Sequence, residues 1–214
     1  TTYNAWEEMV YNDQSNRLFA WGGNSSGVLG QNDRTQRSSP VQIPGTDWAH
    51  QQQSDVKMSA IKTDGTLWTW GRSATGGMGL NQGGTVSVSS PTQIPGTTWS
   101  SFITGFSGGG GDGNGAALKT DGSLWQWGSN NYGQLGVNNR TQYSSPVQLT
   151  APSGTWDKQA LAECSTAQIK DGKLYMAGRN NEGGLGHNSK TQRSSPTQVG
   201  TNTTWANIDL GDYG

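Results

Sequence analysis

A short apolar segment, rich in aromatic residues and closed by glycine, occurs four times along an otherwise polar chain. It reads leucine, aromatic residue, variable residue, tryptophan or alanine, glycine, at residues 18–22, 67–71, 124–128 and 174–178. The closing glycines are 49, 57 and 50 residues apart. A short apolar run bounded by turn residues is typical of a β-strand. A repeat of this length is typical of β-architectures in which similar sheets stack on one another.

The polar residues around these segments follow one order. A tryptophan after a Gly/Thr-rich turn precedes a short strand, the apolar segment comes third, and a strand after Ser-Ser-Pro comes last. In three repeats Asp-Gly separates the second and third strands, which favours a tight hairpin turn with positive φ. Proline cannot donate to a sheet, so the strand that it opens belongs at an outer edge. These prolines are Pro40, Pro91, Pro146 and Pro196. The order predicts four-stranded units.

A glycine-rich turn recurs between the third and fourth strands, at residues 27–30, 76–79, 133–136 and 183–186. Each copy has one large side chain before its last glycine. Glycine-rich phosphate sites open a helix, and no helical period follows any of these turns. We interpret them as structural turns, each pinned by one buried side chain.

Composition excludes several classes of protein. Only 30% of the residues are hydrophobic, yet there are 10 Trp and 33 Gly, whereas disordered chains are poor in aromatic residues and rich in charge. A net charge of −1 gives no general attraction to nucleic acid or anionic lipid. No apolar run approaches the roughly 20 residues of a membrane-spanning helix, and no signal-peptide pattern opens the sequence.

The clearest loop copy is Asn-Asn-Tyr-Gly-Gln-Leu-Gly at residues 130–136, shortly after Leu-Trp-Gln-Trp-Gly. The order Trp, Asp-Gly, Leu-Trp-x-Trp-Gly, Asn-x-x-Gly-Gln-Leu-Gly, Pro resembles the regulator of chromosome condensation family of repeats over essentially the whole chain. The resemblance implies a β-propeller with four-stranded blades. It also implies protein binding, since members include an exchange factor and an inhibitor. Known members have more blades than the four counted here.

The two ends of the chain complement one another. Residues 6–11 take the place of a second strand with no first strand before it, and residues 205–214 match a first strand with nothing after it. Pairing them would complete a blade and remove two exposed sheet edges. We therefore predict one all-β propeller domain over residues 1–214, with four four-stranded blades closed by a clasp between the C-terminal strand and the N-terminal blade. The approximate blades are 205–214 plus 1–46, 47–95, 96–149 and 150–204. Two chains forming eight blades, or an arc of a longer propeller, are the alternatives.

Candidates for catalysis or metal binding are scarce. His50 and His187 are the only histidines, and neither has a partner at a metal-ligand spacing. Cys164 is the only cysteine, so neither an internal disulfide nor a cysteine-based metal site can form. Asp112 and Asn114, in a glycine-rich insertion, offer too few oxygens for calcium. We predict a protein that is not an enzyme and has no catalytic residues, no metal site and no cofactor.

Cationic residues recur in the polar tract before each Ser-Ser-Pro, except in the second repeat. Repetition would place these tracts on one rim of a propeller, where arginine and exposed aromatic side chains are good anchors for a protein partner. A solvated loop surface is the simpler interpretation of the same charges. The candidate protein-binding residues are Arg34, Arg37, Arg140, Tyr143, Lys190 and Arg193.

Two classes of function fit these observations. We expect a non-enzymatic protein-binding scaffold, foremost a structural or display component of a larger assembly such as a virus or phage particle, because few side chains titrate near neutral pH. The alternative is a soluble regulatory module, an inhibitor or exchange-factor-like protein, as the resemblance implies. The expected partners are other proteins, including copies of this chain, rather than nucleic acid or membranes. The compartment stays open, with a virion or an extracellular location compatible with the first class.

Overall fold

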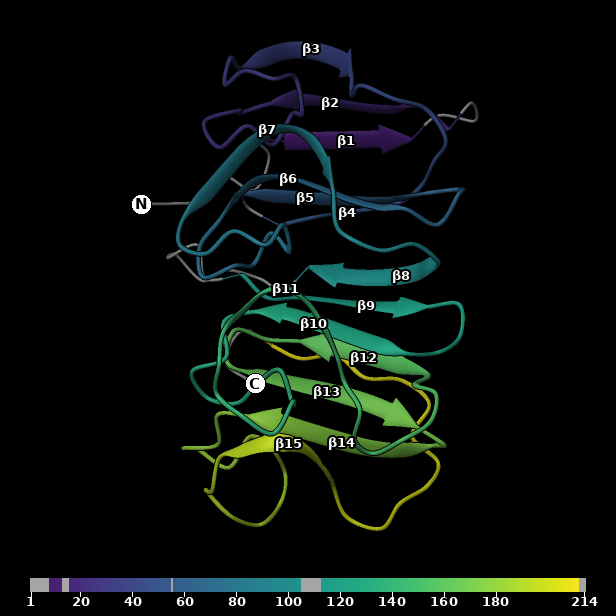
Figure 1. The fold of residues 1–214 in the computed structure, drawn as a ribbon, viewed down its shortest axis with the longest axis vertical. Helices are drawn as coiled ribbons and strands as arrows, with labels where there is room; N and C mark the ends of the chain where they lie inside the picture. Colours follow the sequence, from purple (N-terminus) through teal and green to yellow (C-terminus); the bar gives the residue numbers. More distant parts are fainter. Residues whose placement is uncertain (1–7, 13–15, 55, 105–112, 212–214) are drawn as a thin grey trace.

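Four antiparallel sheets follow one another in chain order along the long axis of the molecule, the first at the top of Figure 1 and the fourth at the bottom. The computed structural model describes residues 8–12, 16–54, 56–104 and 113–211. Within these residues there is no helix, and none of them forms a helix that could cross a membrane. The all-β class predicted from the sequence is confirmed.

The first sheet has three strands and each of the others has four. The first contains β1 (Glu8–Asn12), β2 (Leu18–Gly22) and β3 (Arg37–Gln42). The second contains β4 (Trp48–Gln53), β5 (Lys57–Lys62), β6 (Leu67–Ser73) and β7 (Val86–Gln93). The third contains β8 (Trp99–Thr104), β9 (Gly115–Lys119), β10 (Leu124–Gly128) and β11 (Tyr143–Gln148). The fourth contains β12 (Lys158–Leu161), β13 (Ser165–Lys170), β14 (Lys173–Gly178) and β15 (Arg193–Gln198).

Strand order within each sheet equals chain order, so the strand that contains Ser-Ser-Pro is always at an edge, although the proline lies inside this strand and does not open it as expected. The pairing of the last two strands shifts register just before the closing glycine in all four sheets. These glycines have a positive φ, for example 97° at Gly71, a conformation that other residues rarely adopt. A Cβ at Gly71 would also lie only 2.3 Å from the Val56 carbonyl oxygen. Glycine is therefore required where this bulge bends the sheet.

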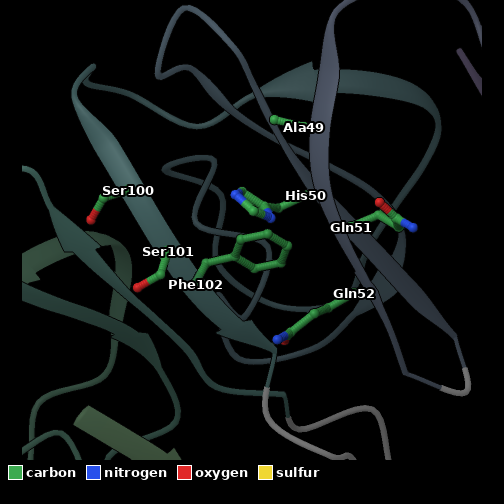
Figure 2. A pocket seen from close by; sticks show the side chains of 7 residues that line it. All are labelled: Ala49, His50, Gln51, Gln52, Ser100, Ser101 and Phe102. Atoms are coloured by element: carbon green, nitrogen blue, oxygen red, sulfur yellow. The ribbon is translucent and has the colours of Figure 1, made fainter. Parts of the chain in front are cut away.

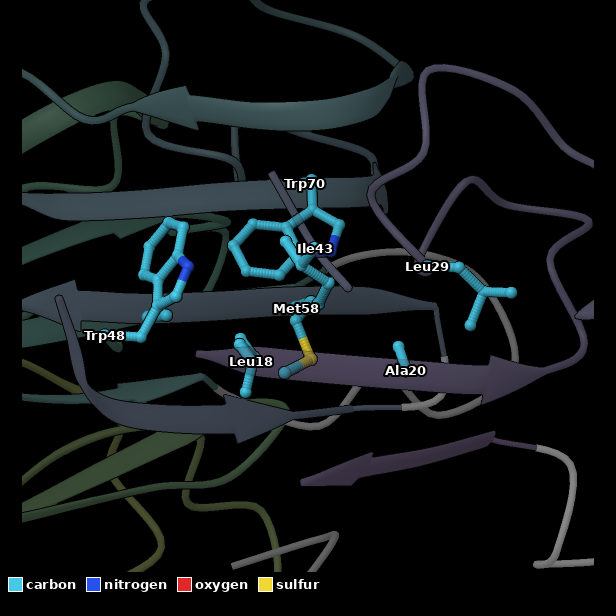
Figure 3. Close-up of a cluster of buried hydrophobic side chains, with 8 residues drawn as sticks. Leu18, Ala20, Leu29, Ile43, Trp48, Met58 and Trp70 are labelled. Carbon is cyan, nitrogen blue, oxygen red and sulfur yellow. The ribbon is translucent and has the colours of Figure 1, made fainter. Parts of the chain in front are cut away.

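Tryptophan side chains fill the space between sheets. Trp48 is fully buried, meets Trp68 edge-on at 6.2 Å between ring centroids, and lies 5.8 Å from Trp70. Figure 3 shows how Trp48, Trp70 and the apolar residues of β2 and β5 form one core between the first two sheets. The Lys62 ammonium lies over the rings of both Trp48 and Trp68, an arrangement that adds a cation–π attraction.

Each sheet is also joined to the next by a repeated set of hydrogen bonds, which we call the inter-sheet tie. The Asn32 backbone N–H donates to the Ser89 carbonyl at 2.7 Å, and the Ser90 hydroxyl donates to the Asn32 side-chain oxygen at 3.2 Å. In the same contact the Trp70 indole N–H donates to the Val28 carbonyl at 2.6 Å. The later ties use Asn81 with Ser144 and Ser145, and Asn138 with Ser194 and Ser195.

The predicted closing clasp is not found, and this expectation is corrected for the described residues. Residues 205–211 form no strand, and β1 pairs only with β2. Ile208 and Leu210 pack instead against the core of the fourth sheet. The first and fourth sheets lie at opposite ends of the stack, and residues 205–211 lie at the fourth sheet, away from β1 of the same chain (Figure 1). Residues 1–7 and 212–214 of the predicted clasp lie outside the described residues.

Candidate protein-interaction surface

The four loops between the last two strands of each sheet all emerge on one side of the stack, the left side in Figure 1. We call this surface the loop rim, made of residues 23–36, 74–85, 129–142 and 179–192. In the second, third and fourth sheets, the tight hairpins between the second and third strands lie on the opposite side. Stacking therefore gathers four loops that are far apart in the sequence onto one surface.

A buried asparagine amide organises three of these loops. In the third loop the Asn130 side-chain oxygen accepts from the Leu135 N–H at 3.0 Å, and its amide donates to the carbonyls of Asn139 and Thr141 at 3.0 and 2.9 Å. Asn24 and Asn180 make the equivalent bonds in the first and fourth loops, and Ser73 has this position in the second. The amide satisfies backbone groups that a loop would otherwise leave unpaired, so it holds the loop in one shape.

The structure brings the three equivalent cations of the polar tracts to this rim. Arg34 and Arg140 are exposed, and each also reaches the following sheet, where Arg34 donates to the Ser87 hydroxyl at 2.9 Å and Arg140 to the Gln192 side-chain oxygen at 3.0 Å. Lys190 is exposed in the fourth loop. The second loop has no cation among residues 74–85, so the charge on the rim is interrupted there.

The other three candidate residues are more constrained. Arg37 forms an ion pair with Asp33 at 2.6 Å. A hydrogen bond from the Thr35 backbone, and then the Arg37 guanidinium, lower the pKa of the Asp33 carboxyl. The Tyr143 hydroxyl accepts from the Asn139 amide at 3.0 Å, and Arg193 is only partly exposed. These residues shape the loops more than they project from them.

A groove of about 460 Å³ lies between β4 and β8, the first strands of the second and third sheets. His50 of β4 and Phe102 of β8 point into it, with Gln52, Ser100 and Ser101 beside them (Figure 2). None of the residues predicted from the sequence lines this groove except His50, although the glutamine run at residues 51–53 indicates that β4 faces a polar space. No group of three or more His, Cys, Asp or Glu residues able to hold a metal occurs in the described part of the chain.

Sequence reasoning also missed a buried amine. Lys57, at the start of β5, is 3% exposed, and its ammonium donates to the carbonyls of Gly77 and Asn114 at 3.1 Å each. Asn114 belongs to the next sheet's segment, so this lysine helps to join the second and third sheets. Burial lowers the pKa of Lys57 from 10.5 to about 8.

This burial predicts a pH dependence of stability. Between pH 8 and 10.5 the unfolded chain binds the Lys57 proton that the folded chain has lost, so the free energy of unfolding rises as pH increases through this window. Between pH 7.5 and 9.5, the free energy of unfolding of the wild type should rise by on the order of 2 kcal/mol more than that of Lys57→Met. Urea unfolding of both proteins across this pH range measures the difference. The exposed-site variant Lys158→Met should follow the wild-type profile. Equal slopes for the wild type and Lys57→Met would refute this assignment.

Stacked antiparallel sheets of three or four strands, with inter-sheet ties and a loop rim, define a β-propeller repeat protein. The regulator of chromosome condensation (RCC1) repeat profile matches residues 15–51, 64–111, 121–166 and 171–213. The chain therefore belongs to the RCC1 repeat family.

Curated relatives share parts of this chain. The ultraviolet-B receptor UVR8 of Arabidopsis thaliana is 32% identical over 145 residues, which is 63% of this chain and 30% of the receptor. Human RCC2 is 37% identical over 90 residues, covering 42% of this chain and 16% of RCC2. The human E3 ubiquitin-protein ligase HERC2 is 29% identical over 126 residues, only 2% of its length. The chain thus spans less than a third of each of these relatives.

Solved structures confirm the propeller-type fold. Human WBSCR16 superposes with a TM-score of 0.73 at 20% identity, over 91% of this chain and 50% of that chain. Prp20p of Saccharomyces cerevisiae, in a study of its binding to Gsp1p and histones, gives 0.74 at 16% identity, over 91% and 49%. At these identities the likeness shows the fold alone. The four sheets correspond to about half of each of these chains.

Proposed function

We propose that this chain is a non-enzymatic protein-binding module that recognises its partner through the loop rim. The observation that carries the proposal is the set of loops held on one side of the stack by buried side chains. Such loops lose little conformational freedom on binding, which favours affinity. Arg34, Arg140 and Lys190 provide the exposed cations, and arginine is enriched among the residues that dominate protein interfaces.

The relatives support protein partners rather than a particular one. Prp20p has been studied with Gsp1p and histones, and yeast RCC1 (Prp20) has been solved bound to Kap60. A regulatory binding role fits these names better than a viral structural role does. HERC2 is named a ligase, but this chain matches only 2% of that protein.

The proposal is tested by photo-crosslinking from the loop rim. A benzoylphenylalanine at Lys190 should form a discrete crosslink to a protein in an extract of the cells that express the chain. The same group at Lys158, an exposed lysine on β12, should form no such crosslink.

The double variant Arg34→Ala/Arg140→Ala should reduce the yield of the crosslink from position 190 about tenfold or more. The charge-matched control Lys158→Ala/Lys173→Ala should leave capture unchanged. Equal crosslinking from both positions, or none, would contradict the proposal.

A structural role in a larger assembly is the second candidate, because few of the side chains titrate near neutral pH. Native purification distinguishes the two roles. Recovery of the chain within a particle or filament would favour assembly, and recovery with one soluble partner would favour regulation.

A further inference from the structure

The groove between β4 and β8 continues along the two strands into a second hollow of about 350 Å³. The two hollows share Ala49, His50 and Ser100, so they form one elongated groove. This groove lies between the second and third sheets, the two middle sheets of the stack. Both of its walls therefore belong to the middle of the chain, and a further sheet at either end of the stack would not lie between them.

The groove is open because polar side chains take apolar positions at this boundary. His50 lies opposite Ile61, which packs with Phe102 in the core between the second and third sheets. His50 therefore faces the third sheet, and Gln52, two residues further along the strand, shares that face. At the next boundary the place of Gln52 in the repeat is taken by Ile103, which packs against the core between the third and fourth sheets. An apolar side chain there closes the space that is open here.

The larger hollow offers neutral hydrogen-bonding groups around one apolar ring. His50, Gln52, Ser100 and Ser101 are exposed, whereas Phe102 is buried and presents its ring to the groove (Figure 2). Within the described residues, neither the His50 ring nor the Ser101 hydroxyl makes a hydrogen bond to the protein. Both side chains are therefore available to a ligand, as donors and as acceptors.

A charged ligand does not suit this groove. No Asp, Glu, Lys or Arg lines the larger hollow, and the smaller one has one residue of each sign, Lys62 and Asp64. The Lys62 ammonium lies over two tryptophan rings, and the Asp64 carboxylate accepts hydrogen bonds from Thr66. A charged ligand would lose hydration here without gaining an ion pair. The polar walls equally disfavour a ligand that is apolar on all sides.

The strand edges beside the groove do not suit an extended peptide. Each strand has a bulge where its register with the next strand shifts, with Ala49 as the extra residue in β4 and Ser100 in β8. Both extra residues line the groove. A bulge interrupts the regular backbone spacing that an added strand needs, and bulges often occur beside binding sites because they redirect side chains. The groove thus favours a small ligand over a further strand.

We propose that this groove binds a small neutral sugar of one or two pyranose rings. A pyranose has hydroxyl groups around its edge and an apolar face of C–H groups, which matches polar walls around the Phe102 ring. The ring packs against the C–H face, and His50 and Ser101 form hydrogen bonds with the hydroxyl groups. The larger hollow, about 460 Å³, lies within the range of roughly 300–1,000 Å³ for small-molecule sites. No residue of the loop rim lines the groove, so this site is independent of the proposed protein binding.

Titration of the isotope-labelled chain with neutral sugars, followed by two-dimensional NMR of the backbone amides, tests the proposal. The probes are glucose, galactose, N-acetylglucosamine, maltose and lactose. At least one of them should shift the amides of residues 49–52 and 100–102, and the shifts should saturate with a Kd on the order of 1 mM or tighter. Glucose 6-phosphate should bind no more tightly than glucose, because the larger hollow has no cation to pair with the phosphate.

Two variants place the sugar in the groove. Ser101→Trp fills the groove from an exposed position and should weaken binding about tenfold or more. His50→Ala removes a hydrogen-bonding wall and should weaken it about threefold or more. His187→Ala, which changes the other histidine outside the groove, is the matched control and should bind as the wild type does. Amides far from each substitution should keep their wild-type positions, which shows that the fold is intact.

Three results would each overturn the proposal. The first is that none of these sugars gives saturable shifts at concentrations up to about 50 mM. The second is that glucose 6-phosphate binds about tenfold more tightly than glucose, which would indicate an anion site. The third is that Ser101→Trp binds as well as His187→Ala does.

Discussion

Replacing Trp70 with alanine is expected to lower the free energy of unfolding by about 3–5 kcal/mol, the range for removing a large buried aromatic side chain. Trp70 is fully buried between the first two sheets, contacts the Trp48 ring at a tilt of 55°, and donates to the Val28 carbonyl at 2.6 Å. The substitution leaves a cavity and an unpaired carbonyl in the same place. Urea unfolding at one fixed protein concentration measures the loss.

The variant Trp70→Phe separates the two contributions. It keeps an aromatic ring in the core but removes the N–H, so we expect a smaller loss of about 1–2 kcal/mol. A loss below about 1 kcal/mol for Trp70→Ala would show that the first two sheets do not pack as described.

Replacing Asn130 with alanine is expected to cost about 2–3 kcal/mol of unfolding free energy, although the residue lies in a loop. Its side chain is fully buried, and it holds the buried Leu135 N–H as well as the carbonyls of Asn139 and Thr141. In the variant, the two carbonyls lie near the surface and can accept hydrogen bonds from water, whereas the Leu135 N–H stays buried without an acceptor. Thermal or urea unfolding gives the value.

The neighbouring residue offers a matched control. Asn131 is exposed and accepts one hydrogen bond from the Gln142 side chain at 3.1 Å, so Asn131→Ala should change stability by less than about 0.5 kcal/mol. Asn130→Asp should be at least as harmful as Asn130→Ala, because a carboxylate would face two carbonyl oxygens. Equal stability of the 130 and 131 alanine variants would exclude a structural role for the buried amide.

The strands were predictable because their signals are local. Asp64-Gly65 forms the expected hairpin, in which the Lys62 N–H donates to the Thr66 carbonyl at 2.9 Å, and Pro91 lies in the edge strand β7. The buried role of Asn130 was also within reach of the sequence. Asparagine follows the closing glycine by two residues in three of the four repeats, a spacing that marks a side chain with a fixed structural task.

The failed clasp and the unforeseen Lys57 have a different origin. Whether the ends of one chain meet depends on the rotation between successive sheets, which accumulates along the stack and leaves no local pattern. Lys57 resembles an ordinary charged residue at the start of a strand, and the carbonyls that bind it come from a loop and from the following sheet. Both features depend on packing between sheets, which no single repeat encodes.

A preorganised loop rim is what the binding proposal requires, and native-state hydrogen exchange of the free chain tests it most directly. The amides of Leu29 and Leu135 donate to buried asparagine oxygens at 3.0 Å. They should open with free energies within about 1 kcal/mol of global unfolding, like amides in the central strands. The exposed Gly83 amide should exchange rapidly. Exchange of Leu29 and Leu135 as fast as that of Gly83, with the strands still protected, would contradict a rigid rim.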